Sequence, residues 1–316
     1  MDASRSKYMS GPVKEDNFIC IGSKNECDFF VEEFKGTYSA WNKSPNHLET
    51  FNSIHLEPTK TERRRKKLPP FLSEMENAYD LLSPIIFLPQ FNTETIPPKL
   101  SYLRLRASSW EDYNRLHGVC GEYSLLCGKT PVRWPENLVL PSLKAIQFLR
   151  YECRCFHKLS LTPEHVPFLE YFESTLDKKG FLMDTIVGFK KLKYLSLGAV
   201  GNNSQLFEKI PKTVEFLRIN ASHYKFNLDQ ITRLKNLKAL ELMYIPVEFD
   251  CKFFTQLPKL EQIKLQNTKK IRNIEALLDC KKLKWLKLVG CNKPIKGALK
   301  EQFEQHGFDY LDTDFS

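Results

Sequence analysis

Apolar side chains recur at a fixed spacing along the second half of the chain. Five times in succession, one aliphatic residue is followed three and five residues later by two more, and the first members are Leu192, Val214, Leu237, Leu260 and Leu283. These first members are 22, 23, 23 and 23 residues apart. The last two apolar residues of each copy flank a single residue, which predicts a short strand with both side chains on one face. The period indicates an internal repeat whose coils bury their apolar faces only by stacking on one another.

Weaker copies of the same pattern extend it in both directions. The copies are Leu100-Leu103-Leu105, Leu143-Ile146-Phe148, Leu169-Phe172-Ser174 and a terminal half-copy, Phe308-Leu311-Thr313. Leu100 and Leu143 are 43 residues apart, which is longer than one period. This gap predicts either a degenerate coil or an insertion.

The repeats resemble those of the leucine-rich repeat superfamily, in its class of short repeats. The resemblance covers residues 96–316 and is clearest over residues 189–291. It implies an α/β solenoid, a horseshoe with a parallel β-sheet on the concave side and irregular or short helical segments on the convex side. The family usually places Asn, Cys or Thr three residues after the third leucine, and this chain lacks a ladder of Asn there. The positions hold Ser108, Tyr151, Asp177, Val200, Ser222, Ile245, Thr268 and Cys291.

The two ends of the chain differ from the repeats. Residues 1–95 do not repeat cleanly and are expected to form an N-terminal capping or flanking region, with a helix within residues 25–41. Residues 292–316 are expected to form a C-terminal cap with a closing helix at 297–305. Two worn coils are candidates in the N-terminal region: Phe51-x-x-Ile54-x-Leu56 and Leu82-x-x-Ile85-x-Phe87.

Composition and charge place the chain among globular proteins. It has 316 residues, 42% of them hydrophobic, and a net charge of +9. No apolar run approaches the ~18 residues of a membrane helix, and the first thirty residues lack the apolar stretch of a secretory signal. The nine cysteines are therefore expected to be reduced thiols in a cytoplasmic protein.

A basic run lies between the candidate worn coils. Residues 60–67 carry six bases in eight positions and end at Leu68-Pro69-Pro70, which predicts an exposed loop. Three functions are compatible with it: nuclear import, an anionic surface, or contact with an acidic partner. A solvated loop without such a function is the fourth interpretation. The bases considered for a site are Arg63, Arg64, Arg65, Lys66 and Lys67.

Motifs for catalysis and for metal or nucleotide binding are weak. Gly128-Lys129-Thr130 lacks the glycine that a phosphate-binding loop places four residues upstream. Cys153-x-Cys155-x-His157 departs from the Cys-x-x-Cys spacing of zinc sites. No Gly-x-Ser-x-Gly turn and no His-x-x-x-His pair occurs. We therefore expect no enzyme activity, no cofactor, no metal and no small-molecule substrate.

Strand geometry provides the candidate binding surface. If the strand leucines point inward, the residues beside them line the concave face, and six of the nine residues just before the second leucine are aromatic. Aromatic residues beside arginines are typical of protein interfaces, although aromatics on strands also pack laterally against each other. The residues expected to bind a partner are Tyr102, Arg104, Tyr171, Tyr194, Phe216, Arg218, Glu241, Lys264, Trp285 and Lys287.

These residues predict a non-enzymatic protein that binds another protein. Two versions remain open, an adaptor or scaffold and an inhibitor of the immunity type. The alternative is a nucleic-acid-associated protein that uses the basic run. Acidic residues within the concave face, namely Glu173, Glu241 and Asp312, argue against that alternative because they interrupt the positive charge.

Overall fold

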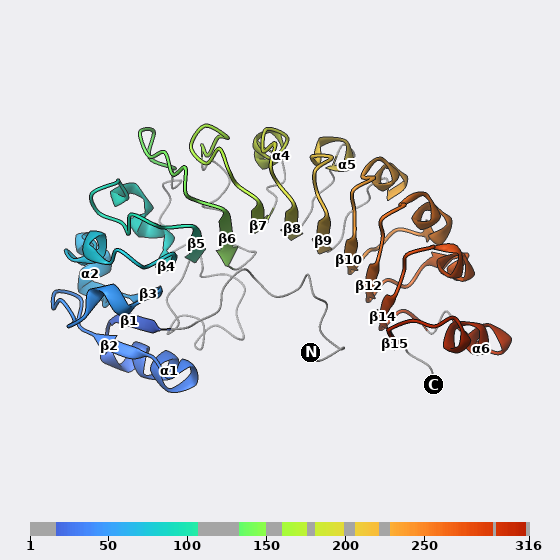
Figure 1. Ribbon diagram of the computed structural model, residues 1–316, viewed down its shortest axis with the longest axis horizontal. Coiled ribbons are helices and arrows are strands. Elements are labelled where there is room, and N and C mark those ends of the chain that lie inside the picture. The colour runs from blue at the N-terminus through green and yellow to red at the C-terminus, as the bar shows by residue number, and fades with distance from the viewer. Residues whose placement is uncertain are drawn as a thin grey trace. The chain divides into compact units, whose positions relative to one another are not determined.

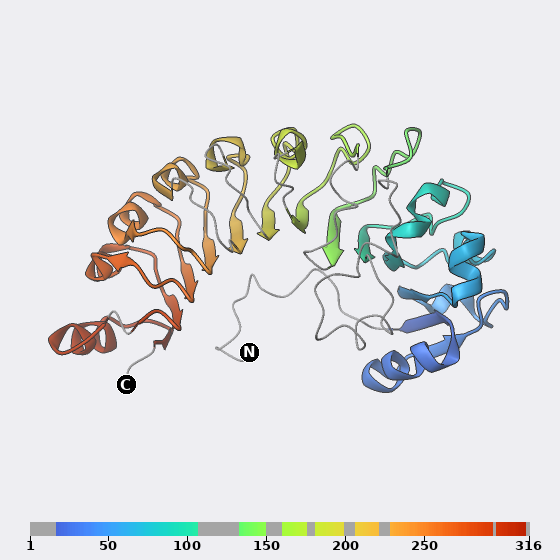
Figure 2. The ribbon, with the colours of Figure 1, turned by 180° about the vertical axis from the view of Figure 1, so that it is seen from behind.

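The computed structural model of the chain describes residues 17–106, 133–149, 160–175, 181–198, 206–220, 228–292 and 295–313 (Figure 1). Two compact units divide these residues, the first ending at Ser174 and the second beginning at Thr175. Both units consist of short parallel strands, each followed by a helical or irregular return segment. Figure 2 shows that the return segments of the second unit lie on one side of its strands.

The first unit is built around seven parallel strands among its described residues. Their order in the sheet is β2-β1-β3-β4-β5-β6-β7, so from β3 onward the order follows the chain. The strands are β1 (Phe18–Gly22), β2 (Thr37–Ser39), β3 (Ser53–Glu57), β4 (Asp80–Pro84), β5 (Tyr102–Arg106), β6 (Ala145–Leu149) and β7 (Tyr171–Thr175). The helical segments are α1 (Lys24–Phe34), α2 (Lys60–Arg65) and the 3₁₀ helices η1 (Leu48–Thr50), η2 (Leu72–Glu74) and η3 (Ile85–Gln90).

The second unit repeats one coil with little variation. Its described main-sheet strands follow the chain in the order β8-β9-β10-β12-β14-β15, and β11 and β13 form a separate parallel pair. The strands are β8 (Tyr194–Gly198), β9 (Phe216–Asn220), β10 (Ala239–Met243), β11 (Phe249–Asp250), β12 (Gln262–Gln266), β13 (Ile271–Arg272), β14 (Trp285–Val289) and β15 (Tyr310–Asp312). The helical segments are α4 (Phe181–Ile186), α5 (Leu206–Lys209), η6 (Leu228–Arg233), η7 (Cys251–Gln256), η8 (Ile274–Asp279) and α6 (Ala298–Gln305).

The repeated leucines form the core, as their spacing predicts. The Cα atom of Leu240 lies in register with Leu217 on one neighbouring strand and with Ile263 on the other. All three side chains are buried, together with the first leucine of the same coil, Leu237. Because every coil presents its apolar side chains at the same register, stacking the coils produces one continuous core in the unit.

The weaker sequence copies are also strands. The copies at Leu103, Ile146, Phe172 and Leu311 correspond to β5, β6, β7 and β15. The long gap between the first two of these copies is an insertion, because β5 pairs directly with β6 through five residues. The alternative of a degenerate coil with its own strand between them is therefore wrong. Residues 107–132 of that gap lie outside the described residues.

Only one of the two candidate worn coils has the expected register. Ile54 and Leu56 are buried on β3, as predicted. The second candidate is wrong, because β4 spans Asp80–Pro84 and its inward residues are Leu81 and Ser83. Ser83 occupies a position that leucine fills elsewhere, and its hydroxyl donates to the carbonyl of Pro84 at 3.2 Å. This polar residue in a core position conceals the repeat from a search for leucines.

The basic run forms a helix instead of the expected loop. Thr59 caps α2: the Glu62 amide donates to the Thr59 hydroxyl at 3.3 Å, and the Thr59 amide donates to a Glu62 carboxylate oxygen at 2.6 Å. The helix ends at Lys66, whose φ of 53° is left-handed. Three arginines lie in the last turn, where the negative end of the helix dipole favours cations. The capping box thus overrides the loop signal of the charge run.

The helix predicted within residues 25–41 is shorter than that range. α1 ends at Phe34 and is followed by a left-handed Lys35. At Gly36 an added Cβ would lie 2.1 Å from the Phe18 ring, so only glycine fits this close approach to β1. The chain then turns into β2. The closing helix expected at 297–305 is present as α6.

The turns after the strands are stabilised without an Asn ladder. In three successive coils a residue with positive φ follows the strand, at Tyr244, Asn267 and Gly290. The amide of Tyr244 donates to the carbonyl of Gln266 at 2.8 Å, and the amide of Asn267 donates to the carbonyl of Val289 at 2.7 Å. Main-chain hydrogen bonds between coils therefore stabilise these turns without a ladder of Asn side chains. The next residue of each coil, at Ile245, Thr268 and Cys291, is buried.

Candidate binding face

Three residues of each five-residue strand point away from the leucine core. We call the surface that they form the open face, and its three columns are the first, third and fifth positions of the strands. The register defines the columns: Phe216, Arg218 and Asn220 of β9 lie beside Ala239, Glu241 and Met243 of β10. All ten residues expected to bind a partner occupy the first or third column. The open face corresponds to the surface that the sequence predicts as concave.

Aromatic residues of the second unit form two separate stacked pairs in the first column. The ring centroids of Tyr194 and Phe216 are 4.1 Å apart, and those of Trp285 and Tyr310 are 5.1 Å apart. The Phe216 side chain is only 2% exposed and Trp285 6%, whereas Tyr194 and Tyr310 are half-buried. One member of each pair is therefore a packed support and the other presents its ring to solvent.

Charged side chains of the third column pair across neighbouring strands of the second unit. Arg218 Nε lies 2.6 Å from Glu241 Oε2, and Lys287 Nζ lies 2.8 Å from Asp312 Oδ2. The hydrogen bond from Lys287 holds the pKa of Asp312 below its usual value and raises the pKa of Lys287. Lys264 is half-buried and lies in register between Glu241 and Lys287. The column therefore presents three cations and two carboxylates.

The two columns of the second unit also contact each other. The Arg218 guanidinium lies 5.8 Å from the centroid of the Phe216 ring, and Lys287 Nζ lies 5.9 Å from that of Tyr310. The Tyr310 hydroxyl donates to Asp312 at 3.1 Å. Cation–π contacts and the ion pairs hold these long side chains in defined positions. These charged side chains of the unit's open face thus already have partners within the chain.

The first unit joins its aromatic and polar residues into a chain of hydrogen bonds. The Tyr102 hydroxyl donates to Gln147 at 2.8 Å, and the Gln147 amide donates to Glu173 at 3.0 Å. The Tyr171 hydroxyl donates to the same Glu173 oxygen at 2.7 Å. The rings of Tyr102 and Tyr171 meet edge to face with centroids 6.2 Å apart, over the small Ala145 of the strand between them. Two of the expected site residues are therefore in contact across a strand.

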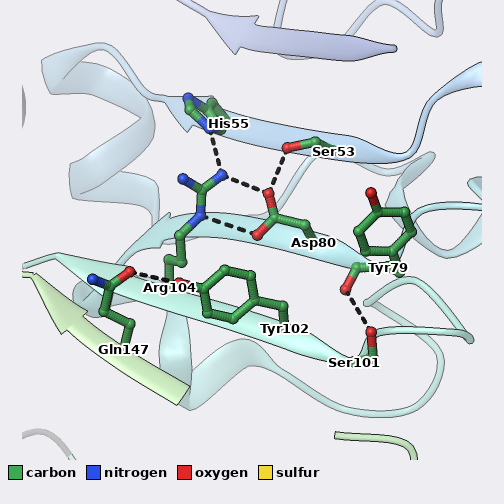
Figure 3. A network of polar contacts seen from close by, with 8 residues as sticks. All are labelled: Ser53, His55, Tyr79, Asp80, Ser101, Tyr102, Arg104 and Gln147. Carbon is green, nitrogen blue, oxygen red and sulfur yellow. Dashed lines mark hydrogen bonds and ion pairs between the residues drawn. The ribbon is translucent and has the colours of Figure 1, made fainter. Parts of the chain in front are cut away.

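A second polar network surrounds Arg104 (Figure 3). Its guanidinium donates to both oxygens of Asp80, from Nε at 3.0 Å and from Nη2 at 2.5 Å. Nη2 also lies 2.7 Å from His55 Nε2, and the Ser53 hydroxyl donates to Asp80 at 2.5 Å. Burial raises the pKa of Asp80, while Arg104 and the Ser53 hydroxyl act in the opposite direction. Arg104 was expected at this face from the sequence, but its partners Asp80 and His55 were not.

The ring of His55 is buried and neutral in this network. Arginine only donates hydrogen bonds, so His55 Nε2 must be the acceptor and the ring proton must be on Nδ1. Burial and the nearby Arg104 and Arg106 guanidiniums lower the pKa of His55 well below its ordinary value. Phe18 and Phe30 contact the ring edge to face, with centroids 4.3 and 5.3 Å away.

A buried ion pair lies beside His55 in the fifth column. Arg106 Nη2 lies 2.5 Å from Glu57 Oε2 and also donates to the carbonyl of Leu56 at 2.8 Å. Both side chains are buried. Sequence reasoning missed Glu57, Arg106 and the residues around Arg104, because they come from coils that are far apart in the sequence. Aligning β4 at Leu81 would have placed Asp80 beside Tyr102 and revealed the group.

The hydrogen bonds of the network around Arg104 hold its side chains in position. Ser53 gives its hydroxyl hydrogen to Asp80, and His55 accepts from Arg104, so both serve the arginine–aspartate pair and neither is arranged as nucleophile and base. Within the described residues no three His, Cys, Asp or Glu side chains gather in a way that could hold a metal ion. Cys153, Cys155 and His157 and the Gly128-Lys129-Thr130 segment lie outside the described residues.

The basic residues of α2 are separate from the open-face columns. Arg64, Arg65, Lys66 and Lys67 are exposed, and Arg63 is half-buried. The carbonyl of Lys67 accepts a hydrogen bond from the Trp41 indole at 3.0 Å, which anchors the chain where the run ends. No helix within the described ranges has the length and apolar character that crossing a membrane requires.

No model of a known protein family matches the chain, and a search of curated proteins finds no match. Among solved structures, an internalin (inlF) of Listeria monocytogenes is similar, with a TM-score of 0.39 and 11% identity over 85% of this chain and 64% of the internalin. The complex of TLR13 with ssRNA13 gives a TM-score of 0.37 and 16% identity over 78% of this chain and 41% of that protein.

An internalin C2 (inlC2) of Listeria monocytogenes gives a TM-score of 0.27 and 14% identity over 76% of this chain and 72% of that chain. The present chain spans less than two thirds of the length of the inlF internalin and of TLR13. The fold of this chain follows from its own repeat: a period of 22 to 23 residues, parallel strands in constant register and buried leucines at each turn. The chain therefore has the fold of a leucine-rich repeat solenoid.

Proposed function

We propose that the chain is a non-enzymatic binding protein that holds a partner protein on the open face of its second unit. The observation that supports this proposal is the two stacked aromatic pairs of the first column. A cation of the third column lies over one ring of each pair. Aromatic and arginine side chains that are fixed before binding lose little conformational entropy when a partner arrives.

The members of each pair have different roles in this proposal. Tyr194 and Tyr310 are half-buried, so a partner can cover the rest of their surface. Phe216 and Trp285 are almost fully buried and stack against the rings of Tyr194 and Tyr310 from the neighbouring strands. Binding energy is expected to concentrate on the two tyrosines and on Arg218, since anchors of this kind each cost about 2 kcal/mol or more when truncated.

The charge pattern favours a protein partner over a nucleic acid. The third column carries Arg218, Lys264 and Lys287, but Glu241 lies between the first two and Asp312 follows the third. Phosphates spaced along a nucleic acid strand would meet these carboxylates, whereas a protein surface can offer opposite charges at each position. Asp312 is the most accessible carboxylate of the column, with its side chain 43% exposed.

Two biological roles are compatible with such a surface. One is an adaptor or scaffold within a larger assembly, and the other is an inhibitor of the immunity type that covers the site of a toxin or enzyme. A complex that is stoichiometric, very tight and sensitive to salt supports the inhibitor. Exchange on a scale of seconds with micromolar affinity supports the adaptor. We place the protein in the cytoplasm in either role, with the nucleus as the alternative if α2 acts as an import signal.

The test compares capture by the wild type and by a variant that carries Tyr194→Ala and Tyr310→Ala. Tyr244→Ala is the matched control, because Tyr244 is a tyrosine of the same unit that is 47% exposed and lies after β10, outside the strand. All proteins are first shown to be folded by circular dichroism. A captured protein is then purified and its affinity for each variant is measured by calorimetry.

A partner that binds the wild type and Tyr244→Ala equally, and binds the double variant at least 100-fold more weakly, supports the proposal. Equal affinity for all three proteins contradicts it and directs attention to residues 1–95. The 100-fold threshold corresponds to about 2.7 kcal/mol, which two half-buried anchors should exceed.

Binding of nucleic acid by α2 is the second candidate function. The observation that favours it is the exposure of Arg64, Arg65, Lys66 and Lys67, while Glu62 of the same segment is engaged in the helix cap. Binding through phosphates requires that affinity fall steeply between 50 and 200 mM salt, on the order of tenfold for every two phosphate contacts. Absence of affinity for single-stranded RNA or duplex DNA near 50 mM salt excludes this candidate.

A further inference from the structure

The sulfur atoms of two cysteine side chains in the first unit lie unusually close to each other. Cys20 Sγ on β1 lies 2.7 Å from Cys27 Sγ on α1, and both thiols are free. Both residues are fully buried, within a cluster that includes Phe18 and Phe30. This separation is shorter than a van der Waals contact between two sulfur atoms, so the fold brings the pair close to bonding distance.

The backbone between the two cysteines fixes this approach. The amide of Ser23 donates to the carbonyl of Glu57 at 2.8 Å, and the amide of Cys27 donates to the carbonyl of Ser23 at 2.9 Å, which starts α1 directly after β1. At Gly22 φ is +149°, and an added Cβ would overlap the Glu57 carbonyl. The tight connection returns the first turn of α1 over β1 and places Cys27 on Cys20.

We propose that Cys20 and Cys27 are a redox pair that closes to a disulfide bond when the chain folds in an oxidising environment. The reaction is thiol–disulfide exchange with a small-molecule disulfide. The two thiols lose two protons and two electrons, the Cys20–Cys27 bond forms, and the disulfide is reduced to two small thiols. No metal or other cofactor is required for this step.

Other described cysteines are placed differently. Cys280 Sγ lies 3.7 Å from the carbonyl oxygen of Ala276, and Cys291 Sγ lies 3.4 Å from that of Leu265. Cys251 is buried in η7, and burial raises the pKa of its thiol. These three cysteines serve as matched internal controls, because they are also buried and form no disulfide bond.

Burial determines when the bond can form. It raises the pKa of the Cys20 thiol, so the thiolate that attacks a disulfide is scarce in the folded protein. Exchange is therefore slow once β1 and α1 are packed and rapid while they are still exposed during folding. After closure, the same burial keeps reductants away from the bond. The oxidation state of the pair thus records the compartment in which the chain folded.

The test refolds the full chain from denaturant in glutathione buffers of increasing oxidised fraction, so that burial does not limit access. Free thiols are blocked at acid quench and the protein is digested with trypsin. Cleavage after Lys24 separates the two cysteines into peptides 15–24 and 25–35. We expect these peptides to be linked by a disulfide in oxidising buffers, with the peptides of Cys251, Cys280 and Cys291 fully blocked.

Two results overturn the proposal. One is full blocking of both Cys20 and Cys27 in the most oxidising buffer, and the other is their linkage to different cysteines instead of to each other. A thermal measurement gives independent evidence. Oxidised wild type should melt about 5 °C above the reduced protein, whereas Cys27→Ala should melt at one temperature in both buffers. A difference of the same size in Cys27→Ala also contradicts the assignment.

Discussion

The rings of Tyr194 and Phe216 stack on neighbouring strands, with planes 7° apart and centroids separated by 4.1 Å. Tyr194 is half-buried and Phe216 is almost completely buried, although the two residues hold the same strand position in consecutive coils. The pair therefore separates two contributions that an aromatic row can make. One ring stabilises the unit, and the other is available to a partner.

Substitution of the two rings should separate stability from binding. We expect Phe216→Ala to lower the free energy of unfolding by about 3–5 kcal/mol, because it empties a buried site. Tyr194→Ala should cost about 1–2 kcal/mol of stability and should weaken partner binding. Urea denaturation monitored by circular dichroism measures the first effect, and titration calorimetry with the captured partner measures the second. A larger stability loss for Tyr194→Ala than for Phe216→Ala would contradict this division.

Arg104 and Asp80 should be strongly coupled in stability. Arg104→Met leaves the Asp80 carboxylate buried without its bidentate partner, which should cost about 3–5 kcal/mol of unfolding free energy. Combining it with Asp80→Asn removes the buried charge, so the double variant should lose at least about 1 kcal/mol less than the sum of the single losses. Four urea unfolding curves complete this cycle. Additive losses would show that the two side chains do not act as a pair.

Stability of the first unit should fall in mildly acidic solution because of His55. The folded state lowers the pKa of this residue below 6.5, so at pH below 6.5 the unfolded chain binds a proton that the folded chain does not. The contribution of neutral His55 to stability is therefore fully present above pH 6.5. Below pH 6.5 the free energy of unfolding decreases by up to about 1.4 kcal/mol per pH unit, until the pH reaches the pKa of His55 in the folded state.

The variant His55→Gln isolates this contribution. Glutamine retains an acceptor for Arg104 and does not titrate. The difference in unfolding free energy between wild type and variant should therefore shrink as the pH falls from 7 to 5. Asp80 changes the stability in the opposite direction, because its raised pKa favours the folded state as the pH falls through that pKa. This effect is the same in the wild type and in His55→Gln. A pH-independent difference would show that His55 is protonated equally in both states.

Gly290 should be essential to the turn after β14. Its φ is +64°, and an added Cβ would lie 2.3 Å from Asn267 Oδ1 of the previous coil. Gly307 also has a positive φ, +86°, but nothing lies within 4 Å of its added Cβ. We expect Gly307→Ala to cost about 1 kcal/mol through backbone strain alone, and Gly290→Ala to cost measurably more. Thermal unfolding of the two variants measures the difference, and equal losses would contradict the role of Asn267.

The repeat made most of the fold predictable from sequence. Leu286 and Leu288 are fully buried on β14, as are Ile263 and Leu265 on β12, because alternate residues of a strand face the same side. β4 was misplaced because Ser83 occupies a core position. α2 was mistaken for a loop because charge and proline outweighed the capping box of Thr59 and Glu62. Both errors arise where polar residues stabilise the fold, in a core position or in a helix cap.

The strand positions of the residues on the candidate face could be predicted from the sequence, but the exposure of their side chains could not. The strand pattern places Tyr102, Phe216 and Trp285 on the open face, yet their burial depends on which ring each one meets on a nearby strand. The partners of Arg104 were harder to predict: His55 is 49 residues away and Asp80 is 24 away, and only the strand register brings them together. No short motif encodes such a group.

Constant register has a consequence for how this protein can change in length. Residue 239 of β10 lies opposite residue 262 of β12, and residue 262 lies opposite residue 285 of β14, so a step of 23 residues returns the chain to the same place. Removal or duplication of one such step would join two surfaces that already fit, with every leucine still facing inward. Coil number is therefore a quantity that gene duplication can alter without designing a new core, and each added coil would lengthen the open face by one strand.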